Sequence, residues 1–207
     1  MLVARPAFCF ARPLTIRDLF LILSKKLPLG TTHCIGWSTG QTGLMDVLRT
    51  LDLDSSSVVL RRAKADDLPA IVDLIAADQL GTARDGIRTP ADLAAYQEAF
   101  RVIDADPAQI LMVAESGHDI VATMQLSFIP GLSRRGALRA QLEAVRVHEA
   151  YRDRGLGAAI FAWAIDEARQ RGCALVQLTT DKSRTSAHRF YERLGFVASH
   201  EGMKLAL

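Results

Sequence analysis

Hydrophobic and polar positions after residue 57 follow the periods of strands and helices in turn. Residues 122–128 alternate strictly between apolar and polar side chains, which predicts a half-buried antiparallel strand. Apolar residues instead recur at helical spacing after the acids and proline of 66–69, after Thr89-Pro90, from 156 to 171 and around Phe190. The predicted order is a strand, two helices, three strands, a helix, a strand, a helix and two short strands near 196–199 and 203–205.

The strand predicted from Leu138 to Val147 changes the phase of its apolar positions part-way along. Even-numbered positions are apolar up to Ala144, whereas Val145 and Val147 then occupy odd positions. Because successive side chains on a strand point to opposite faces, this slip indicates a β-bulge. The elements together predict an α/β fold of the mixed α+β type: a central, mostly antiparallel sheet with one bulged strand and helices on both faces.

The stretch Arg152-Asp153-Arg154-Gly155-Leu156-Gly157 lies between the bulged strand and the long helix. Its two glycines allow a tight turn and close approach of a ligand, and the amides that open the helix favour negative charge. We therefore predict a phosphate-binding loop, extended to Ala158 in the first helical turn. A dinucleotide fold is excluded because the third glycine of its fingerprint would fall at Ile160.

This loop and a second motif in the right order resemble the GCN5-related N-acetyltransferase (GNAT) superfamily over residues 58–207. The loop resembles the family's acetyl-CoA pyrophosphate loop, and residues 187–196 resemble the second motif, with Tyr191 near the CoA sulfur. The stretch Val145-Arg146-Val147 resembles the strand end whose backbone pairs with the pantetheine arm. Where the family often has Asn, seven positions before Tyr191, this chain has Arg184, which either reaches a CoA phosphate or is a solvated surface residue.

The resemblance implies transfer of an acetyl group from acetyl-CoA to a primary amine by direct attack in a ternary complex. An amine attacks only when neutral, so a base is needed. Glu143 is our candidate, because an acid in the middle of a buried strand is costly without a task; the alternative is a structural ion pair with an arginine. Glu115 and Glu149 are weaker candidates. Tyr191 is the candidate general acid, and plain core packing is its alternative.

We expect the acceptor to be a small-molecule amine. Two alternatives stay open: a protein acetyltransferase that modifies lysine or an N-terminus, and a non-catalytic acyl-CoA sensor on the same scaffold. A homodimer is implied by family analogy alone. The acceptor cannot be read from the sequence, because variable helices and loops line that side of the site.

Charge and cysteine content exclude several other classes. Residues 58–207 carry 19 basic and 19 acidic side chains, without the concentrated basic face that nucleic-acid binding needs. The three cysteines form no Cys-x-x-Cys pair and the histidines have no ligand spacing, so we expect no metal and a reducing, cytoplasmic location. The apolar run 19–23 is too short to span a membrane.

Residues 1–57 look unlike the rest of the chain. They begin with Arg5, Arg12 and Arg17 and have no acid before Asp18. We expect an N-terminal extension that is poorly ordered or arises from an upstream start, with Met45 as the alternative start, followed by one acetyltransferase domain at 58–207. An organellar transit peptide is the other possibility for this segment.

Overall fold

The computed structural model describes residues 47–53, 56–77, 81–82 and 84–206; the expectations for residues 1–46 lie outside this part of the chain. The described residues contain one six-stranded sheet in the order β1-β2-β3-β4-β5-β6. Neighbouring strands are antiparallel except for β5 and β6, which are parallel. The strands are β1 (Val47–Leu53), β2 (Ser56–Arg62), β3 (Gln109–Ser116), β4 (Asp119–Pro130), β5 (Leu138–Val147) and β6 (Leu175–Leu178).

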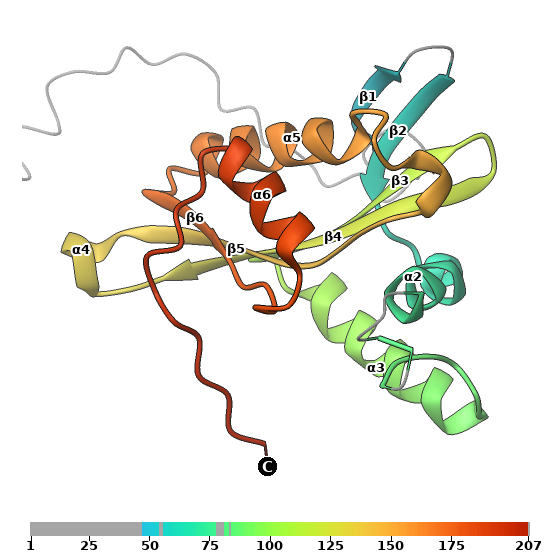
Figure 1. The fold of residues 1–207 in the computed structure, drawn as a ribbon. Coiled ribbons are helices and arrows are strands. Elements are labelled where there is room, and N and C mark those ends of the chain that lie inside the picture. Colours follow the sequence, from blue (N-terminus) through green and yellow to red (C-terminus); the bar gives the residue numbers. More distant parts are fainter. Residues whose placement is uncertain (1–46, 54–55, 78–80, 83, 207) are drawn as a thin grey trace, which may run out of the picture. The chain divides into compact units, whose positions relative to one another are not determined.

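Helices lie on both faces of this sheet. In Figure 1, α5 crosses above the strands, whereas α2 and α3 lie below them. The helical elements are η1 (Ala65–Asp67), α2 (Leu68–Ala76), α3 (Pro90–Ala105), α4 (Ser133–Gly136), η2 (Glu149–Tyr151), α5 (Leu156–Gln170) and α6 (Thr185–Arg193). The predicted mixed fold with a mostly antiparallel sheet is therefore confirmed.

The sheet begins earlier than the sequence pattern indicated. Strand β1 (Val47–Leu53) lies inside the segment 1–57 that we expected to be an extension, and it pairs with β2. Its half-buried side chains Leu48, Leu51 and Leu53 pack against the main core, which explains why the strand joins the sheet. Within the described residues, the domain therefore begins at Val47 and not at residue 58.

The hydrophobic core lies between the sheet and α5. Buried even-numbered side chains from the middle of β3 and β4 form this cluster together with Leu156, Ile160 and Phe161 of the helix; they are Ile110, Met112, Ala114, Ala122, Met124, Leu126 and Phe128. A smaller cluster on the opposite face joins Val113 of β3 to Ile71 of α2. The two faces of the sheet are therefore covered differently: α5 packs on one face, and α2 and α3 cover part of the other.

The two strands predicted near 196–199 and 203–205 are absent from the structure, in which described residues after Arg193 form no helix or strand. Val197, Met203 and Leu205 are 80%, 93% and 87% exposed. The alternation of apolar and polar residues here therefore buries little apolar surface. An alternating pattern forms a strand only when a neighbouring strand accepts its hydrogen bonds. The C-terminal residues instead run away from the sheet (Figure 1).

An ion-pair network fastens α2 to the sheet. Asp67 accepts hydrogen bonds from Arg61 at 2.7 and 2.9 Å and from the Lys64 backbone N–H at 2.7 Å. Glu115 accepts a further bond from Arg61. Burial alone would raise the pKa of Asp67, but the hydrogen bonds and positive charge of Arg61 and Lys64 lower it.

We expect Asp67→Asn to lower the free energy of unfolding by about 3 kcal/mol at pH 7, because it leaves a largely buried guanidinium with a weaker partner. A carboxylate whose folded pKa is lowered stabilises above its unfolded pKa of about 4, and this contribution is lost as the pH falls through the folded value. Urea unfolding from pH 7 to pH 2.5 should therefore show the two proteins converging in acid. A constant difference across that range would contradict the assignment.

Candidate active site

Strands β5 and β6 separate beyond Leu142. Their parallel ladder runs from the pair Arg139 and Leu175 to the pair Leu142 and Leu178, where β6 ends. The next step of the β4 ladder is irregular, since β5 advances three residues from Glu143 to Arg146 while β4 advances two. Ala144, inside this step, has a left-handed backbone with φ of 51°. The predicted β-bulge is thus confirmed, and it lies where the sheet opens.

Backbone groups of β5 point into this opening. The His148 N–H donates to the Val121 carbonyl on β4 at 2.8 Å. Because hydrogen bonding alternates along an antiparallel strand, the backbone groups of Val147 and Val145 turn away from β4. Their carbonyls accept bonds from Arg152 Nε at 3.1 Å and from Arg146 Nη1 at 2.8 Å.

The loop after β5 ends at the start of α5. Asp153 and Gly155 both have left-handed backbones, with φ of 58° and 82°, so the chain reverses sharply before Leu156. Leu156 is fully buried and fixes the first turn, and Gly155 caps the helix without any side-chain hydrogen bond. The first N–H groups of α5 therefore have no acceptor from a capping side chain and carry the positive end of the helix dipole.

The arginines of this loop are exposed beside the helix start. Arg152, Asp153 and Arg154 are exposed, and the Arg154 guanidinium lies 5.3 Å from the centre of the Tyr151 ring. Two exposed arginines beside a helix N-terminus provide positive charge that suits a phosphate group.

Gly157 of α5 lies beside Phe190 of α6. A Cβ atom at this position would lie 3.5 Å from Cζ of Phe190, at ordinary van der Waals contact. Phe190 and Tyr191 pack against Phe161, with ring centroids 5.4 and 5.6 Å apart. Sequence analysis assigned Gly157 to the ligand alone and missed that this position faces Phe190, which lies on the predicted helical stripe.

Tyr191 combines packing with a polar environment. Burial raises the pKa of Tyr191, and the positive charges of Arg184 and Arg146 act in the opposite direction. The phenol is therefore protonated at neutral pH and available as a hydrogen-bond donor. Arg184, at the start of α6, is half-buried, and its contact with a CoA phosphate stays a prediction.

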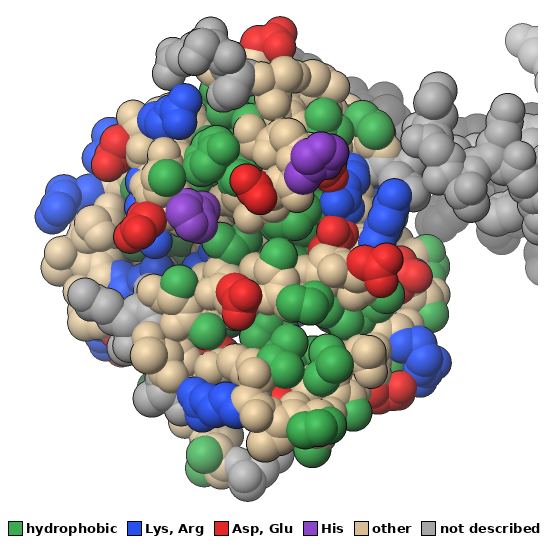
Figure 2. Space-filling view, turned by 90° about the vertical axis from the view of Figure 1, so that its right-hand side faces the viewer, with side chains coloured by type: hydrophobic (Ala, Val, Ile, Leu, Met, Phe, Trp, Pro, Cys, Tyr) green, Lys and Arg blue, Asp and Glu red, His purple; other side chains and the backbone are tan. Residues whose placement is uncertain are grey.

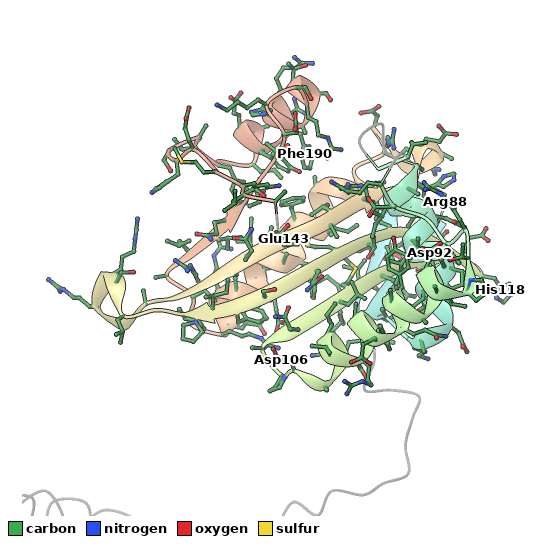
Figure 3. All side chains as sticks on the ribbon, turned by 90° about the horizontal axis from the view of Figure 1, so that it is seen from below. Arg88, Asp92, Asp106, His118, Glu143 and Phe190 are labelled. Atoms are coloured by element: carbon green, nitrogen blue, oxygen red, sulfur yellow. The ribbon has the colours of Figure 1, made fainter. Side chains whose placement is uncertain are left out.

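Glu143 is exposed, which corrects our premise that it is buried. It lies just beyond the last β6 pair, and Figure 3, viewed from the side of α2 and α3, shows it on a part of the sheet that neither helix crosses. Gln141 Nε2 donates to its carboxylate at 2.9 Å, and Gln177 Nε2 donates to Gln141 Oε1 at 2.6 Å. Within the described residues no arginine forms an ion pair with Glu143, so the structural-pair alternative finds no support.

The two weaker candidates for the base lie elsewhere. Glu115 is engaged with Arg61 in the network that fastens α2. Glu149 lies exposed in η2, after the end of β5. Glu143 is the one of the three that lies at the bulge.

The charges of the surface are mixed. Figure 2 shows Lys and Arg side chains interspersed with Asp and Glu on the face that it presents. The described residues contain no group of three His, Cys, Asp or Glu side chains that could hold a metal ion. No helix in this part of the chain is long and apolar enough to cross a membrane.

Comparisons with known proteins identify the same fold and motifs. The model of the Acetyltransferase (GNAT) family matches residues 75–196. An aminoalkylphosphonate N-acetyltransferase from Salmonella typhimurium is 28% identical over 141 residues, covering 68% of this chain and 86% of that protein.

Two solved structures also align over most of the domain. One, of a transcriptional regulator from Bacillus halodurans C-125, has 45% identity and a TM-score of 0.68, covering 72% of this chain and 99% of that one. An acetyltransferase from Trypanosoma brucei has 26% identity and a TM-score of 0.58 over the same shares. Because the family match spans more than half of the chain and includes both motifs, this protein belongs to the acetyltransferase (GNAT) family.

Proposed function

We propose that this protein transfers an acetyl group from acetyl-CoA to the primary amine of a small molecule, by direct attack within a ternary complex. The observation that carries the proposal is the opening beside the β5 bulge. There the backbone of Val145 turns away from β4, the Glu143 carboxylate is exposed, and α6 carries Tyr191. A donor group, a base and a phenol are the parts that aminolysis of a thioester requires.

The chain offers separate groups for the parts of acetyl-CoA, which supplies the acetyl thioester. Residues 152–158 hold the diphosphate through the first amides of α5 and the arginine side chains. The backbone of Val145, Arg146 and Val147 pairs with the pantetheine arm, and Arg184 adds positive charge near Tyr191.

Each reacting atom has a partner in the proposed chemistry. Glu143 accepts the proton of the attacking amine as the new nitrogen–carbon bond forms. The Val145 N–H stabilises the negative charge on the thioester oxygen, and Tyr191 donates its proton to the leaving sulfur as the carbon–sulfur bond breaks. Bound side by side, amine and thioester need no covalent enzyme intermediate.

A small acceptor is favoured by one relative. The Salmonella protein acts, by its name, on aminoalkylphosphonates, which are small primary amines. The 45% identical relative is named a transcriptional regulator. For that reason a non-catalytic acyl-CoA sensor is retained as the alternative function. A sensor would need no base or acid at the opening, so Glu143 and Tyr191 favour the enzyme.

The test is a thiol-release screen with the purified full chain, acetyl-CoA and panels of amines, amino acids and peptides, with the acetylated product identified by mass spectrometry. We expect release with at least one class of small amine. Labelling of peptides alone would establish a protein acetyltransferase. Binding of acetyl-CoA without release in any panel would establish the sensor.

Gly157→Val is expected to weaken acetyl-CoA binding about tenfold, because its branched side chain would displace Phe190 and shift the α5 start that holds the diphosphate. Gly157→Ala is the matched control, since its Cβ lies at ordinary contact distance and should change affinity less than threefold. Titration calorimetry with acetyl-CoA measures both. Unaltered affinity in the valine variant would contradict the assignment of this loop to the diphosphate of acetyl-CoA.

A further inference from the structure

A row of uncharged polar side chains crosses the sheet on the face opposite α5. Gln109 of β3 is paired with Ser127 of β4, Ser127 with Gln141 of β5, and Gln141 with Gln177 of β6. Because directly paired residues of neighbouring strands point to the same face, the four half-buried side chains form one line across four strands. Glu143 follows Gln141 by two positions on the same face, just past the last β6 pair.

Hydrogen bonds on both sides fix the orientation of the Gln141 amide. Gln177 Nε2 donates to Gln141 Oε1 at 2.6 Å, and Gln141 Nε2 donates to Glu143 Oε1 at 2.9 Å. If the amide turned over, its oxygen would face the carboxylate and its NH2 group would face the NH2 group of Gln177, so both bonds would be lost. Gln177 therefore holds Gln141 in the orientation in which it donates to Glu143.

This arrangement holds one oxygen of the Glu143 carboxylate and leaves the other available. Within the described residues, Oε2 of Glu143 has no hydrogen-bond partner. An exposed glutamate rotates about several bonds, so without a partner its carboxylate would face the opening for only part of the time. Gln125, opposite Glu143 on β4, donates instead to Gln109 at 3.2 Å. Gln141 is thus the side chain that orients this carboxylate.

We infer that Gln141 is the positioning residue for the proposed base. It holds one oxygen of the Glu143 carboxylate and leaves the other to accept the proton of the attacking amine, while Gln177 fixes the orientation of the Gln141 amide. The inference rests on the proposed acetyl transfer and on Glu143 as its base. Because Gln141 acts through Glu143 alone, its removal should matter only under conditions in which the base is needed.

The test uses Gln141→Met, which keeps the length of the side chain and removes its hydrogen bonds, with the most active amine of the thiol-release screen. We expect kcat to fall about tenfold at pH 7, because the carboxylate is no longer held. The KM for the amine and the calorimetric affinity for acetyl-CoA should stay within about twofold of wild type. At pH 10, where a primary amine is about half neutral, the defect should shrink below about threefold.

A double variant separates positioning from an independent role. Glu143→Gln already lacks the base, so addition of Gln141→Met should slow it by less than about twofold. If the two single effects instead multiply, Gln141 acts independently of Glu143 and the inference is overturned.

Gln109→Met is the matched control. Gln109 lies at the other end of the row, where it accepts from Ser127 Oγ at 2.6 Å, and among the described residues it makes no hydrogen bond with Glu143. This variant should keep the rate within about twofold of wild type.

Gln177→Met is a second probe, since it frees the Gln141 amide and leaves Gln141 and the carboxylate in place. We expect it to lower kcat about threefold at pH 7, with the same recovery at pH 10. If Gln141→Met does not fold, this variant carries the test.

The outcomes separate the two proposals. If Gln141→Met keeps the full rate at pH 7, or loses it through the KM for the amine, or if Gln109→Met slows the reaction as much, this inference is overturned while acetyl transfer stands. If no amine in any panel releases thiol with the wild-type chain, the proposed function fails and the inference fails with it.

Discussion

Replacement of Tyr191 by phenylalanine is expected to slow thiol release about 100-fold while leaving acetyl-CoA affinity within threefold of wild type. The ring of Tyr191 packs on Phe161, 5.6 Å between centroids, and phenylalanine keeps that contact. The substitution therefore removes the hydroxyl that we propose as proton donor to the leaving sulfur. Steady-state thiol release and calorimetric titration with acetyl-CoA measure the two quantities separately.

The pH dependence gives this prediction a second readout. Because burial raises the pKa of Tyr191, the wild-type rate should lose the acid form only at a pH above the usual tyrosine value of about 10. That alkaline decline should be absent in Tyr191→Phe. Tyr96→Phe is the matched control, since its hydroxyl, on α3, accepts from the Gly86 N–H at 3.3 Å and its loss should leave the rate unchanged. A full rate in Tyr191→Phe would reduce the residue to core packing.

Elements with local signals could be predicted from the sequence. The helix after Thr89-Pro90 begins where expected, because the Thr89 side chain accepts from the Asp92 N–H while Asp92 accepts from the Thr89 N–H at 2.8 Å. The phase slip between Ala144 and Val145 was likewise sufficient to predict the bulge. In both places the residues that form the sequence pattern also form the local structure that the pattern predicts.

Features that depend on which helices and strands cover a face of the sheet could not be predicted from the sequence. Glu143 lies in the middle of a strand, and only the end of β6 at Leu178 and the placement of α2 and α3 make it exposed. Strand β1 was missed because its register against β2 decides its burial, and its own sequence contains charges at Arg49 and Asp52. Tertiary context outweighs the local pattern at such edges.

The position of the Arg146 guanidinium also escapes sequence analysis. The family resemblance draws attention to the backbone of residues 145–147, whereas the side chain of Arg146 is on the opposite face from Val145 and Val147, which pack against the main core. The bulge thus separates two functions along one strand. Its backbone faces the proposed donor, and the Glu143 side chain faces the proposed acceptor.

Glu143→Gln is expected to lower the rate of thiol release about 100-fold at pH 7, because the amide cannot accept the proton of the attacking amine. A primary amine with a pKa of about 10 is almost entirely protonated at pH 7 but about half neutral at pH 10. The defect should therefore shrink below tenfold at pH 10, and rates across that range measure it. Glu149→Gln, in the exposed turn η2, removes a carboxylate outside the opening and should leave the rate within twofold. A loss that stays constant with pH would show that Glu143 orients the acceptor without taking its proton.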